Sequence, residues 1–524
     1  MKSIYTKPLA FFLMLFWVGL QLNAATYYSK GSLDATLLAS WSNTTDGTGA
    51  SPTDFISTGD IFVIQTGHEM TTSAAWSVGV TAGGGKLQII NGGKLTGTYD
   101  ITIASGNTFQ IDNGGTYVND IANNLSKLFG GTEAFDTNSN FIIVKIAASP
   151  VIADGGYGNL TFRNHETANK SMNSGIQNVK GNLTFETTIN PSTVRFALVG
   201  NQTTTINVGG DLIVNSSDGT GYIVAINVNT GNVTINVAGN IKIMNGTFNM
   251  KAATPALSVL NVGKNLEISG GTFTSVNTVT PSTLNFLGVN SEFIQTGGIM
   301  QNPQNINLGV STDAILSLRN NYTVGNGRSI SVNGTLNVEA GDTLKIGGTT
   351  TGTGVIDASV GTITYNGTTA QTISNIKDNT LKNLVVNNAA GVNLSSNLSV
   401  TGNLNTINGT ITLGDYNLTV TNTGSVTNIE GKIIQNGTGV FTNNAITTSI
   451  NNMQNNLSVK TIDDCIEIGG LTEGSAVRLY SIDGKMINKS IVAKDKVQFN
   501  VKRGAYILNI ASIQKNFSTR IMVK

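Results

Sequence analysis

The sequence predicts an all-β protein, consisting of a right-handed parallel β-helix (a β-solenoid) followed by a small C-terminal β-sandwich. Three observations lead to this prediction. Gly makes up 61 of 524 residues, and 12% of residues are charged, against about 25% in ordinary globular proteins. Short phrases recur through the middle of the chain at the intervals typical of solenoid coils. The last part of the chain changes composition and alternates short apolar-polar runs with turns.

The composition also excludes several functional classes. One Cys and two His are too few for a zinc ribbon, an iron–sulfur cluster or a disulfide framework. The abundance of Asn, Thr and Gly disfavours long helices. Residues 25–450 hold 18 basic and 24 acidic residues and no basic stripe, so a nucleic-acid partner is not expected. The chain lacks a phosphate-binding loop and a calcium-binding repeat motif, and we expect no cofactor and no metal.

The first element, residues 1–24, is predicted to be a secretory signal peptide. Lys2 and Lys7 form its basic start, and an apolar stretch runs over residues 9–22. Small residues follow, so cleavage is expected between Ala24 and Ala25. A membrane anchor is the alternative, but the apolar stretch is short and has no basic flank after it. No other segment is apolar over the length of a membrane span, so no transmembrane helix is expected in the mature chain.

The second element, residues 25–83, is predicted to be an N-terminal β cap or opening segment. The phrases YYSKGS, ASW and FVIQTGHEM resemble the opening segments of repetitive surface proteins of Bacteroidetes. Trp41 and Trp76 are expected to pack over the open first coil of the solenoid. His68 follows an apolar strand beside Gly67, and we expect a structural or surface role for it.

The third element, residues 84–450, is predicted to be the parallel β-helix. LQIINGGKL at 87–95 recurs as FQIDNGGTY at 109–117. A second series, with one member per expected coil, comprises Gly158-Asn159-Leu160, Gly181-Asn182-Leu183, Gly210-Asp211-Leu212, Gly239-Asn240-Ile241 and Lys264-Asn265-Leu266. Two further pairs repeat at one common interval: Asn383-Leu384 with Asn403-Leu404, and Asn397-Leu398 with Asn417-Leu418. Such periods predict coils whose inward Val, Ile and Leu stack, with Asn ladders at the corners and Thr facing outward.

Chemistry-bearing residues are sparse within these repeats. Many β-helix proteins cleave polysaccharides, which requires carboxylates on neighbouring coils. Carboxylates one coil apart remain possible, for example Asp342 and Asp357. The densest polar stretch comprises Arg163, His165, Glu166 and Lys170, and we interpret it as a solvated turn. We therefore predict no catalytic residues and no enzymatic activity.

The last element, residues 455–524, is predicted to be a small β-sandwich. The phrases VRLYSIDGKMI, KRGAYILNI and TRIMVK resemble the C-terminal sorting domain of Bacteroidetes type IX secretion cargo. That resemblance implies that the domain carries the folded cargo across the outer membrane, with the type IX machinery as its partner. The motif residues are Leu479, Tyr480, Asp483, Gly484, Lys485, Gly504, Tyr506 and Lys524. A stabilising cap for the solenoid is the alternative, and the lone Cys465 has no His partner in this segment.

Together these elements favour an adhesin-like or surface-layer protein, secreted across the outer membrane to the cell surface or the medium. Glycans or neighbouring surface proteins are the expected partners of its Thr-, Ser- and Asn-rich faces. A polysaccharide lyase or glycoside hydrolase is the alternative. Ice binding is a minor alternative, because Thr-x-Thr occurs at Thr362–Thr364, Thr410–Thr412 and Thr419–Thr421, although without a constant period.

Overall fold

The protein is an all-β chain that contains a parallel β-solenoid of about 13 turns and almost no helix. The structure is a computed structural model, and two compact units, residues 1–357 and 358–524, are distinguished in it. Its described residues are 24–122, 130–145, 156–164, 170–171, 176–187, 195–199, 203–216, 223–227, 231–251, 257–276, 279–421, 424–429, 431–444, 449–451, 458–462, 464–471, 473–494, 496–511 and 516–523. Two short 3₁₀ helices occur in them, η1 (Leu38–Ser40) and η4 (Pro303–Asn305).

The first unit begins with a sheet in which one strand is antiparallel and the others are parallel. Its strands, in spatial order, are β2 (Trp41–Ser42), β1 (Thr26–Ser29), β3 (Ile61–Ile64), β6 (Lys86–Ile89), β9 (Thr108–Ile111) and β11 (Thr132–Phe135). Nearby, β5 (Trp76–Val78) pairs with β8 (Ile101–Ile103). Leu87 lies opposite Phe109, which confirms the predicted repeat of these two phrases. Trp41 and Trp76 are buried against each other with ring centroids 5.9 Å apart.

Three parallel ladders build most of the first unit, and the coils from β16 to β28 contribute one strand to each ladder. The first ladder contains β4 (Glu69–Thr71), β7 (Lys94–Gly97), β10 (Thr116–Asn119), β12 (Asn140–Ile143), β13 (Asn159–Asn164), β16 (Leu183–Thr187), β19 (Leu212–Ser216), β22 (Ile241–Asn245), β25 (Leu266–Ile268), β28 (Ser291–Gln295), β31 (Ile315–Leu318), β34 (Thr335–Val338) and β37 (Val355–Tyr365). The second contains β15 (Asn178–Val179), β18 (Thr204–Val208), β21 (Val233–Val237), β24 (Ser258–Val262), β27 (Ser282–Phe286), β30 (Ile306–Val310), β33 (Ser329–Val332) and β36 (Thr349–Thr351). The third contains β14 (Lys170–Ser171), β17 (Arg195–Val199), β20 (Ile223–Asn227), β23 (Thr247–Asn249), β26 (Thr272–Thr274) and β29 (Ile299–Gln301), and β32 (Tyr322–Val324) pairs separately with β35 (Thr343–Ile346).

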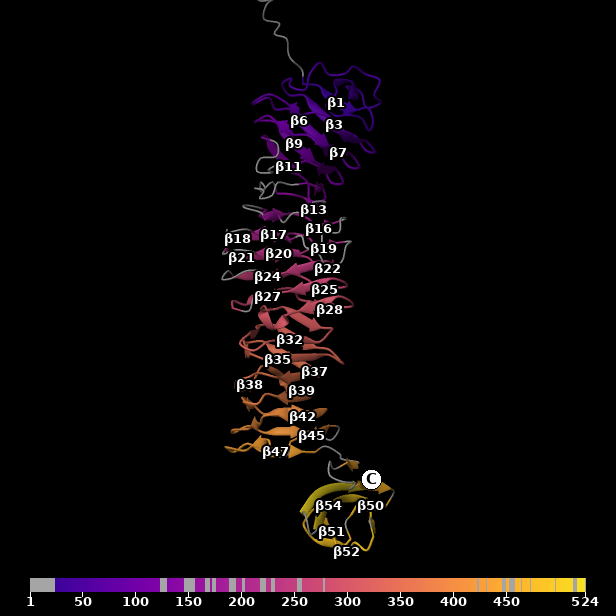
Figure 1. Cartoon of the computed structure of the whole chain (residues 1–524), viewed down its shortest axis with the longest axis vertical. Coiled ribbons are helices and arrows are strands. Elements are labelled where there is room, and N and C mark those ends of the chain that lie inside the picture. Colours follow the sequence, from indigo (N-terminus) through magenta and orange to yellow (C-terminus); the bar gives the residue numbers. More distant parts are fainter. Residues whose placement is uncertain are drawn as a thin grey trace, which may run out of the picture. The chain divides into compact units, whose positions relative to one another are not determined.

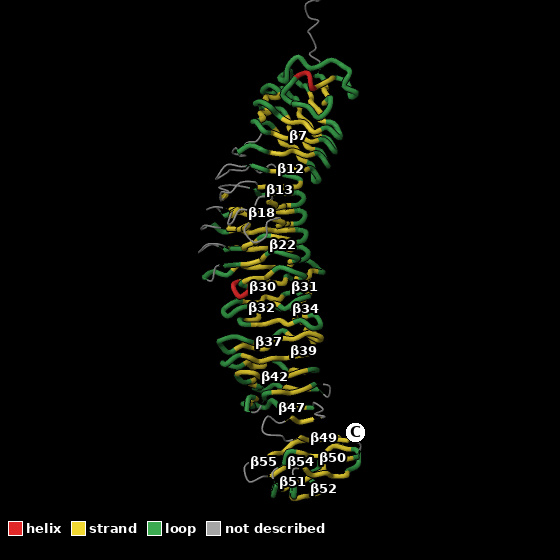
Figure 2. The backbone as a smooth tube through the Cα atoms, turned by 45° about the vertical axis from the view of Figure 1, so that its right-hand side comes forward, coloured by secondary structure: helices red, strands yellow, loops and turns green. Residues whose placement is uncertain are grey.

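The stacking of successive coils is visible in both backbone views. In Figure 1, β18, β21, β24 and β27 follow one another down the unit, and β16, β19, β22, β25 and β28 do so beside them. Figure 2 shows the same coils as short strands joined by turns. The core lies inside these coils, because alternate residues of each strand point inward.

The inward positions carry the aliphatic residues that the sequence pattern predicts. Val237, Ile241 and Ile243 are all buried, with exposed fractions of 2% or less. In the first ladder Leu160, Leu183, Leu212, Ile241 and Leu266 lie opposite one another in consecutive coils. This register confirms the predicted repeat spacings. Complete burial of one such side chain stabilises the fold by about 1.5–3 kcal/mol.

A side-chain cap between coils explains the recurring Gly-Asn pair. The Asn182 backbone N–H donates to Oδ1 of Asn159 at 2.9 Å, and the Asp211 N–H donates to Oδ1 of Asn182 at 2.8 Å. In this coil the preceding residue must be small, because a Cβ on Gly210 would lie 2.3 Å from Oδ1 of Asn182. Each Asn therefore occupies the space that Gly leaves open in the next coil. The predicted Asn ladders at the corners are confirmed in this form.

The second unit contains further parallel strands. One ladder contains β38 (Gln371–Ile373), β40 (Val392–Leu394), β43 (Ile411–Thr412) and β46 (Ile433–Ile434). Beside it run β39 (Ile376–Asn387), β41 (Leu398–Val400), β42 (Asn403–Asn408), β44 (Leu418–Val420), β45 (Ser425–Thr427) and β47 (Phe441–Asn443). Leu384 lies opposite Leu404 and Leu398 opposite Leu418, which confirms both predicted repeats of the Asn-Leu pair.

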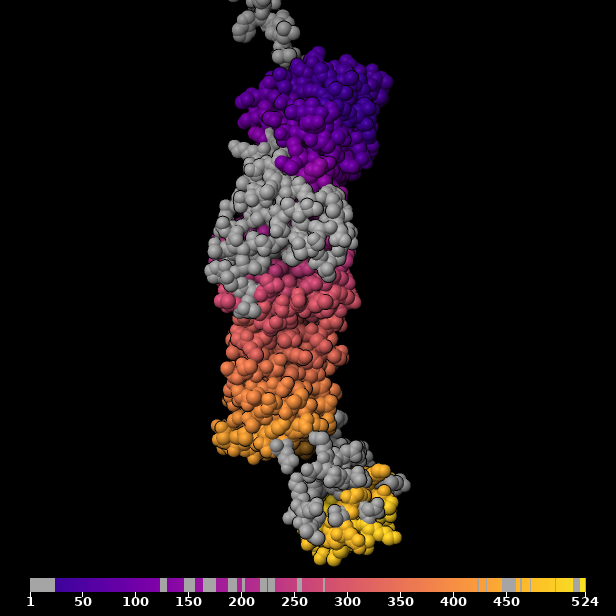
Figure 3. Space-filling view, in the orientation of Figure 1, coloured from indigo at the N-terminus to yellow at the C-terminus, as the bar shows by residue number. Residues whose placement is uncertain are grey.

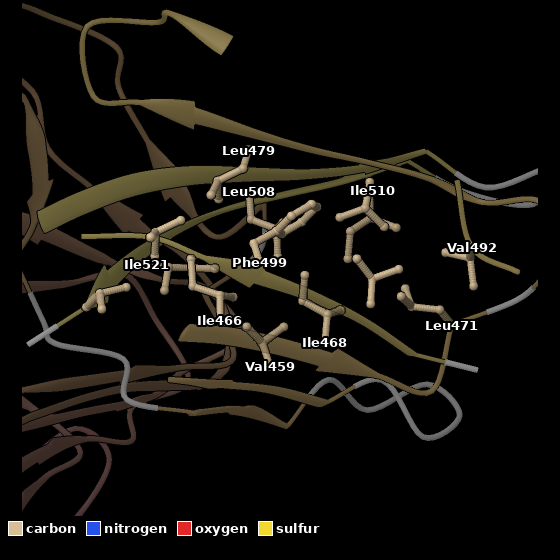
Figure 4. Packing of buried hydrophobic residues seen from close by; sticks show 14 residues of the cluster. Val459, Ile466, Ile468, Leu471, Leu479, Val492, Phe499, Leu508, Ile510 and Ile521 are labelled. Atoms are coloured by element: carbon tan, nitrogen blue, oxygen red, sulfur yellow. The ribbon is translucent and has the colours of Figure 1, made fainter. Parts of the chain in front are cut away.

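The chain ends in two antiparallel sheets. The first contains β48 (Ser449–Asn451), β49 (Ser458–Ile462), β50 (Cys465–Gly469) and β53 (Lys496–Asn500), and the second contains β52 (Met486–Ile491), β51 (Ala476–Ser481), β54 (Gly504–Ala511) and β55 (Asn516–Val523). Both contribute to one hydrophobic cluster of 14 residues. In Figure 4, Leu479 and Leu508 from the second sheet and Ile466 and Phe499 from the first point into the same space.

Candidate binding face

The second ladder of the first unit presents three rows of outward-facing residues that lack any charge. We call this set the amide face. Its members are Thr205, Asn207 and Gly209; Thr234, Asn236 and Ala238; Val259, Asn261 and Gly263; and Thr283, Asn285 and Leu287. The rows arise because β18, β21, β24 and β27 pair in register, so every second residue faces outward at the same height along its strand.

The middle row is a continuous ladder of side-chain hydrogen bonds. Nδ2 of Asn207 donates to Oδ1 of Asn178 at 3.3 Å, and Nδ2 of Asn236 donates to Oδ1 of Asn207 at 2.8 Å. Asn261 and Asn285 continue the ladder at 2.7 and 2.9 Å. An Asn amide has two N–H donors and an oxygen with two lone pairs. Each interior amide thus keeps one donor and one acceptor for a ligand.

Beside this ladder lies an open depression of about 350 Å³, lined by Asn207, Val208, Gly209, Asn236, Val237, Ala238, Gly263 and Leu287. Its floor consists of the three small residues of the third row, Gly209, Ala238 and Gly263. A Cβ on Gly209 would lie 2.3 Å from the carbonyl oxygen of Lys180, and one on Gly263 would lie 2.4 Å from that of Ala238. The backbones of adjacent coils therefore approach closely here, and no larger residue fits at either glycine. Leu287, 45% exposed, contributes an apolar wall.

The first ladder carries ion pairs, in contrast to the amide face. Arg163 Nε lies 2.9 Å from Glu186 Oε2, and Lys242 Nζ lies 2.7 Å from Asp211 Oδ2. Burial alone would raise the pKa of Asp211, but hydrogen bonds from Lys242 and Asn240 lower it overall. The hydrogen bond to Asp211 raises the pKa of Lys242. In each pair the basic and acidic side chains come from neighbouring coils, so their opposite charges partly cancel on the surface of the first ladder.

One cluster on the first ladder contains several carboxylates. Arg319 lies 2.9 Å from Glu292 and 3.8 Å from Glu339, one coil away on either side. Burial, together with the charge of Glu339, raises the pKa of Asp342, while Arg319 opposes that shift. Asp342 therefore interacts with Glu339 and Arg319, whereas Asp357 lies opposite Asn337. Pattern reasoning missed this cluster, because Glu292 and Arg319 are distant in the chain and meet only through the coil register.

Figure 3 shows no deep cleft in the part of the coils formed by described residues between 257 and 357. These residues form a closely packed convex surface there. Among the residues that the structure describes, no group of three or more His, Cys, Asp or Glu side chains is placed to hold a metal ion.

The other polar residues singled out from the sequence belong to different elements or fall outside the described residues. Nδ1 of His68 lies 2.7 Å from the hydroxyl of the buried Ser29, and the same hydroxyl oxygen accepts the Gln65 N–H. His68 therefore links two neighbouring coils. Cys465 lies opposite Asn500 in the first of the C-terminal sheets. His165, Glu166 and the Lys170 side chain fall outside the described residues. The Thr-x-Thr pairs occupy β37, the start of β43 and β44, which pair with different neighbours.

The three C-terminal motifs come together in one sheet. Tyr480 lies opposite Ile507 and Ser481 opposite Tyr506, and Tyr506 in turn lies opposite Ile521. Leu479 is fully buried in the cluster, and the Tyr506 hydroxyl donates to the carbonyl of Lys502 at 2.7 Å.

A tight turn joins the first two strands of this sheet. Asp483, Gly484 and Lys485 form it, with Gly484 at a φ of 84° and the Ser481 N–H donating to the Lys485 carbonyl at 2.8 Å. Positive φ is the conformation that Gly tolerates best, which accounts for the Asp-Gly pair. Gly504 begins β54, while Lys524 and the predicted signal segment before Ala24 lie outside the described residues. No helix within the described part of the chain has the length and apolar character needed to cross a bilayer.

Comparison of the chain with protein-family models, with curated proteins and with solved structures gives no match. The assignment of function therefore depends on the geometry described above.

Proposed function

We propose that the chain is a secreted, cell-surface protein of the adhesin or surface-layer type, which acts by binding rather than by catalysis. The observation that carries this proposal is the uncharged amide face, in which identical hydrogen-bonding groups repeat from coil to coil. Repetition supports multivalent attachment, because each further contact on the same scaffold is intramolecular. An uncharged surface also binds with little dependence on salt.

For the C-terminal segment we propose a β-sandwich that serves as a type IX sorting domain. Two four-stranded sheets with one shared cluster support the sandwich, and the adjacency of the three motifs on β51, β54 and β55 supports the sorting role. We further propose that the solenoid is right-handed, the sense of nearly all crossovers between parallel strands. Export across the outer membrane and cleavage between Ala24 and Ala25 belong to the same proposal.

The export proposal is tested by deleting residues 455–524 in a type IX-competent bacterium. The truncated protein should remain in the periplasm, while the full chain reaches the surface. Surface labelling and cell fractionation measure the outcome. A truncated protein that still reaches the surface would remove the type IX assignment.

A second candidate function, cleavage of an acidic polysaccharide, is favoured by the carboxylates around Arg319. Under the binding proposal the full chain releases no oligosaccharides from pectate or alginate. Arg319 pairs with Glu292, so that carboxylate is held as a salt-bridge partner rather than as a free acid or base. Reproducible release of unsaturated products that stops in a Glu339→Gln variant would establish the enzyme in place of the adhesin.

A further inference from the structure

The depression is lined almost wholly by apolar atoms, and the polar amides of the Asn ladder lie directly beside it. The floor at Gly209, Ala238 and Gly263 is apolar or bare backbone, and the exposed Leu287 adds an apolar wall. The rim is formed by Asn207 and Asn236, whose amides are joined at 2.8 Å. A volume of about 350 Å³ lies within the range of small-molecule sites, roughly 300–1,000 Å³.

This combination selects an amphipathic and uncharged ligand. No Lys, Arg, Asp or Glu is among the described residues that line the depression, so an anionic or cationic ligand would lose hydration without gaining a partner charge. A purely apolar ligand would contact the lining but would make no hydrogen bond to the amide groups of Asn207 and Asn236 beside it. A sugar ring has an apolar C–H face and hydroxyl groups at its edge, and it satisfies both parts of the site.

The repeat of the amide face fits a polymer rather than a single sugar. Neighbouring strands of a sheet are about 4.8 Å apart, so the amides of Asn207, Asn236, Asn261 and Asn285 recur at about that interval. The length of one sugar unit in an extended chain is comparable. A chain that runs along the coils would therefore meet the same amide group at each sugar unit.

We propose that the depression at Ala238 is a binding site for an uncharged, extended polysaccharide that runs along the coils, with one sugar ring over Ala238, its neighbours over Gly209 and Gly263, and their hydroxyls bonded to Asn207 and Asn236. This inference rests on the proposed binding function and specifies its site and ligand class. The ladder formed by Asn261 and Asn285 extends the site to the next sugar units.

The test is affinity electrophoresis of the purified full chain in gels that contain a linear β-glucan, a β-mannan, pectate or alginate. At least one of the two neutral polymers should retard the chain, and about 1 M salt should leave that retardation unchanged because no charges pair. The double variant Asn207→Ala/Asn236→Ala should bind that polymer about tenfold more weakly or worse, because two hydrogen bonds are lost.

The first ladder offers a matched control. Asn215 and Asn245 lie on consecutive coils and are joined in the same way, Nδ2 to Oδ1 at 3.0 Å. The variant Asn215→Ala/Asn245→Ala removes an equivalent pair on a different ladder, and it should bind as the parent does. Ala238→Leu fills the depression without touching an amide and should also weaken binding, whereas Ser317→Leu, outward on β31, should not.

The outcomes separate this inference from the broader proposal. Salt-sensitive retardation by pectate or alginate alone would overturn the site for an uncharged glycan. The chain would then still be an adhesin, but one that binds its ligand through a different, charged surface. Equal loss in both Asn double variants would place the site elsewhere. No retardation by any of the polymers would overturn the site, while surface exposure of the full chain would still test the cell-surface role separately. Thermal melting of each variant checks that its coils remain folded.

Discussion

At the scale of single residues, the corner Asn side chains hold successive coils together through backbone N–H groups. Oδ1 of Asn240 accepts the Asn265 N–H at 3.2 Å, and Asn383 and Asn397 do the same for Asn403 and Asn417 at 2.9 and 2.8 Å. The same bond, from a backbone N–H to the Oδ1 of an Asn in the preceding coil, recurs in both units. This recurrence indicates that Asn is favoured at the corners because its side-chain oxygen accepts that bond. At one corner the acceptor is a carboxylate, which makes that corner sensitive to pH.

Asp211 occupies that corner, and its Oδ1 accepts the Asn240 N–H at 2.7 Å. Its pKa is lower in the folded chain than the ordinary value of 3.8, so its ionised form stabilises folding above about pH 4, and this contribution is lost as pH falls through the folded pKa. Asp211→Asn keeps an acceptor but loses the Lys242 pair. We expect it to be less stable at pH 7 by under about 1 kcal/mol, the usual size for a partly exposed pair.

Urea unfolding of the parent and the Asp211→Asn variant at pH 7 and about pH 2.5 measures this effect. The difference between the two proteins should shrink at the lower pH, because a larger fraction of the parent carboxyl is protonated there. A difference of the same size at both pH values would show that the charge of Asp211 does not contribute.

Inward and outward positions should respond very differently to a new charge. Ile241 is fully buried, so Ile241→Asp places a carboxylate among aliphatic side chains at a cost of several kcal/mol. Thr234 faces outward on the preceding strand, and Thr234→Asp should cost about 0.5 kcal/mol or less. Chemical denaturation of both variants beside the parent measures the two costs. Similar losses in the two variants would mean that the strand register is wrong.

At the scale of strands and turns, glycine in the corner is required by the neighbouring coil rather than by its own backbone. A Cβ on Gly239 would lie 2.3 Å from Oδ1 of Asp211 and 2.6 Å from the Gly210 carbonyl oxygen. Lys264 occupies the same position one coil later, since its N–H donates to the Gly239 carbonyl at 3.1 Å. The coil at Lys264 therefore accommodates a side chain where the earlier coils do not.

Gly239→Ala and Lys264→Ala form a matched pair that tests this explanation. Gly239→Ala should destabilise the solenoid by about 1–3 kcal/mol, because the new methyl group forces the coils apart. Lys264→Ala should change the free energy of unfolding by about 0.5 kcal/mol or less, as surface substitutions usually do. Thermal and chemical unfolding of the two variants provide the comparison, and equal effects would contradict the cap between coils.

The repeat phrases predict the elements of the solenoid well, and they predict its surfaces poorly. The Gly-Asn-Leu series gives the register of the first ladder, because an inward Leu and a corner Asn recur once per coil. The amide face and the Arg319 cluster could not be predicted, since outward neighbours depend on loops of different length between coils. The depression depends in addition on three small residues, Gly209, Ala238 and Gly263, which appear in the sequence as ordinary turn residues.

At the scale of the whole molecule, the chain combines two kinds of stability. In the solenoid each coil contacts its neighbours, so stability accumulates as a sum of local interfaces. The C-terminal sheets depend instead on one cluster of 14 residues, contributed by both sheets. A small core of this kind is marginally stable, and single substitutions in it have large effects. The two parts should therefore unfold in separate steps.

Leu508→Ala tests this separation and the sorting role together. Leu508 is fully buried opposite Leu479, and its truncation should cost about 2–5 kcal/mol. In calorimetry of the full chain, the transition of the C-terminal sheets should move to lower temperature or vanish, while the solenoid transition stays in place. Ile241→Asp should do the reverse, and Lys489→Ala on the exposed β52 should move neither. In cells, Leu508→Ala should accumulate in the periplasm if the folded sheets are the sorting signal. One transition that shifts in both core variants would show instead that the chain unfolds as a single cooperative unit.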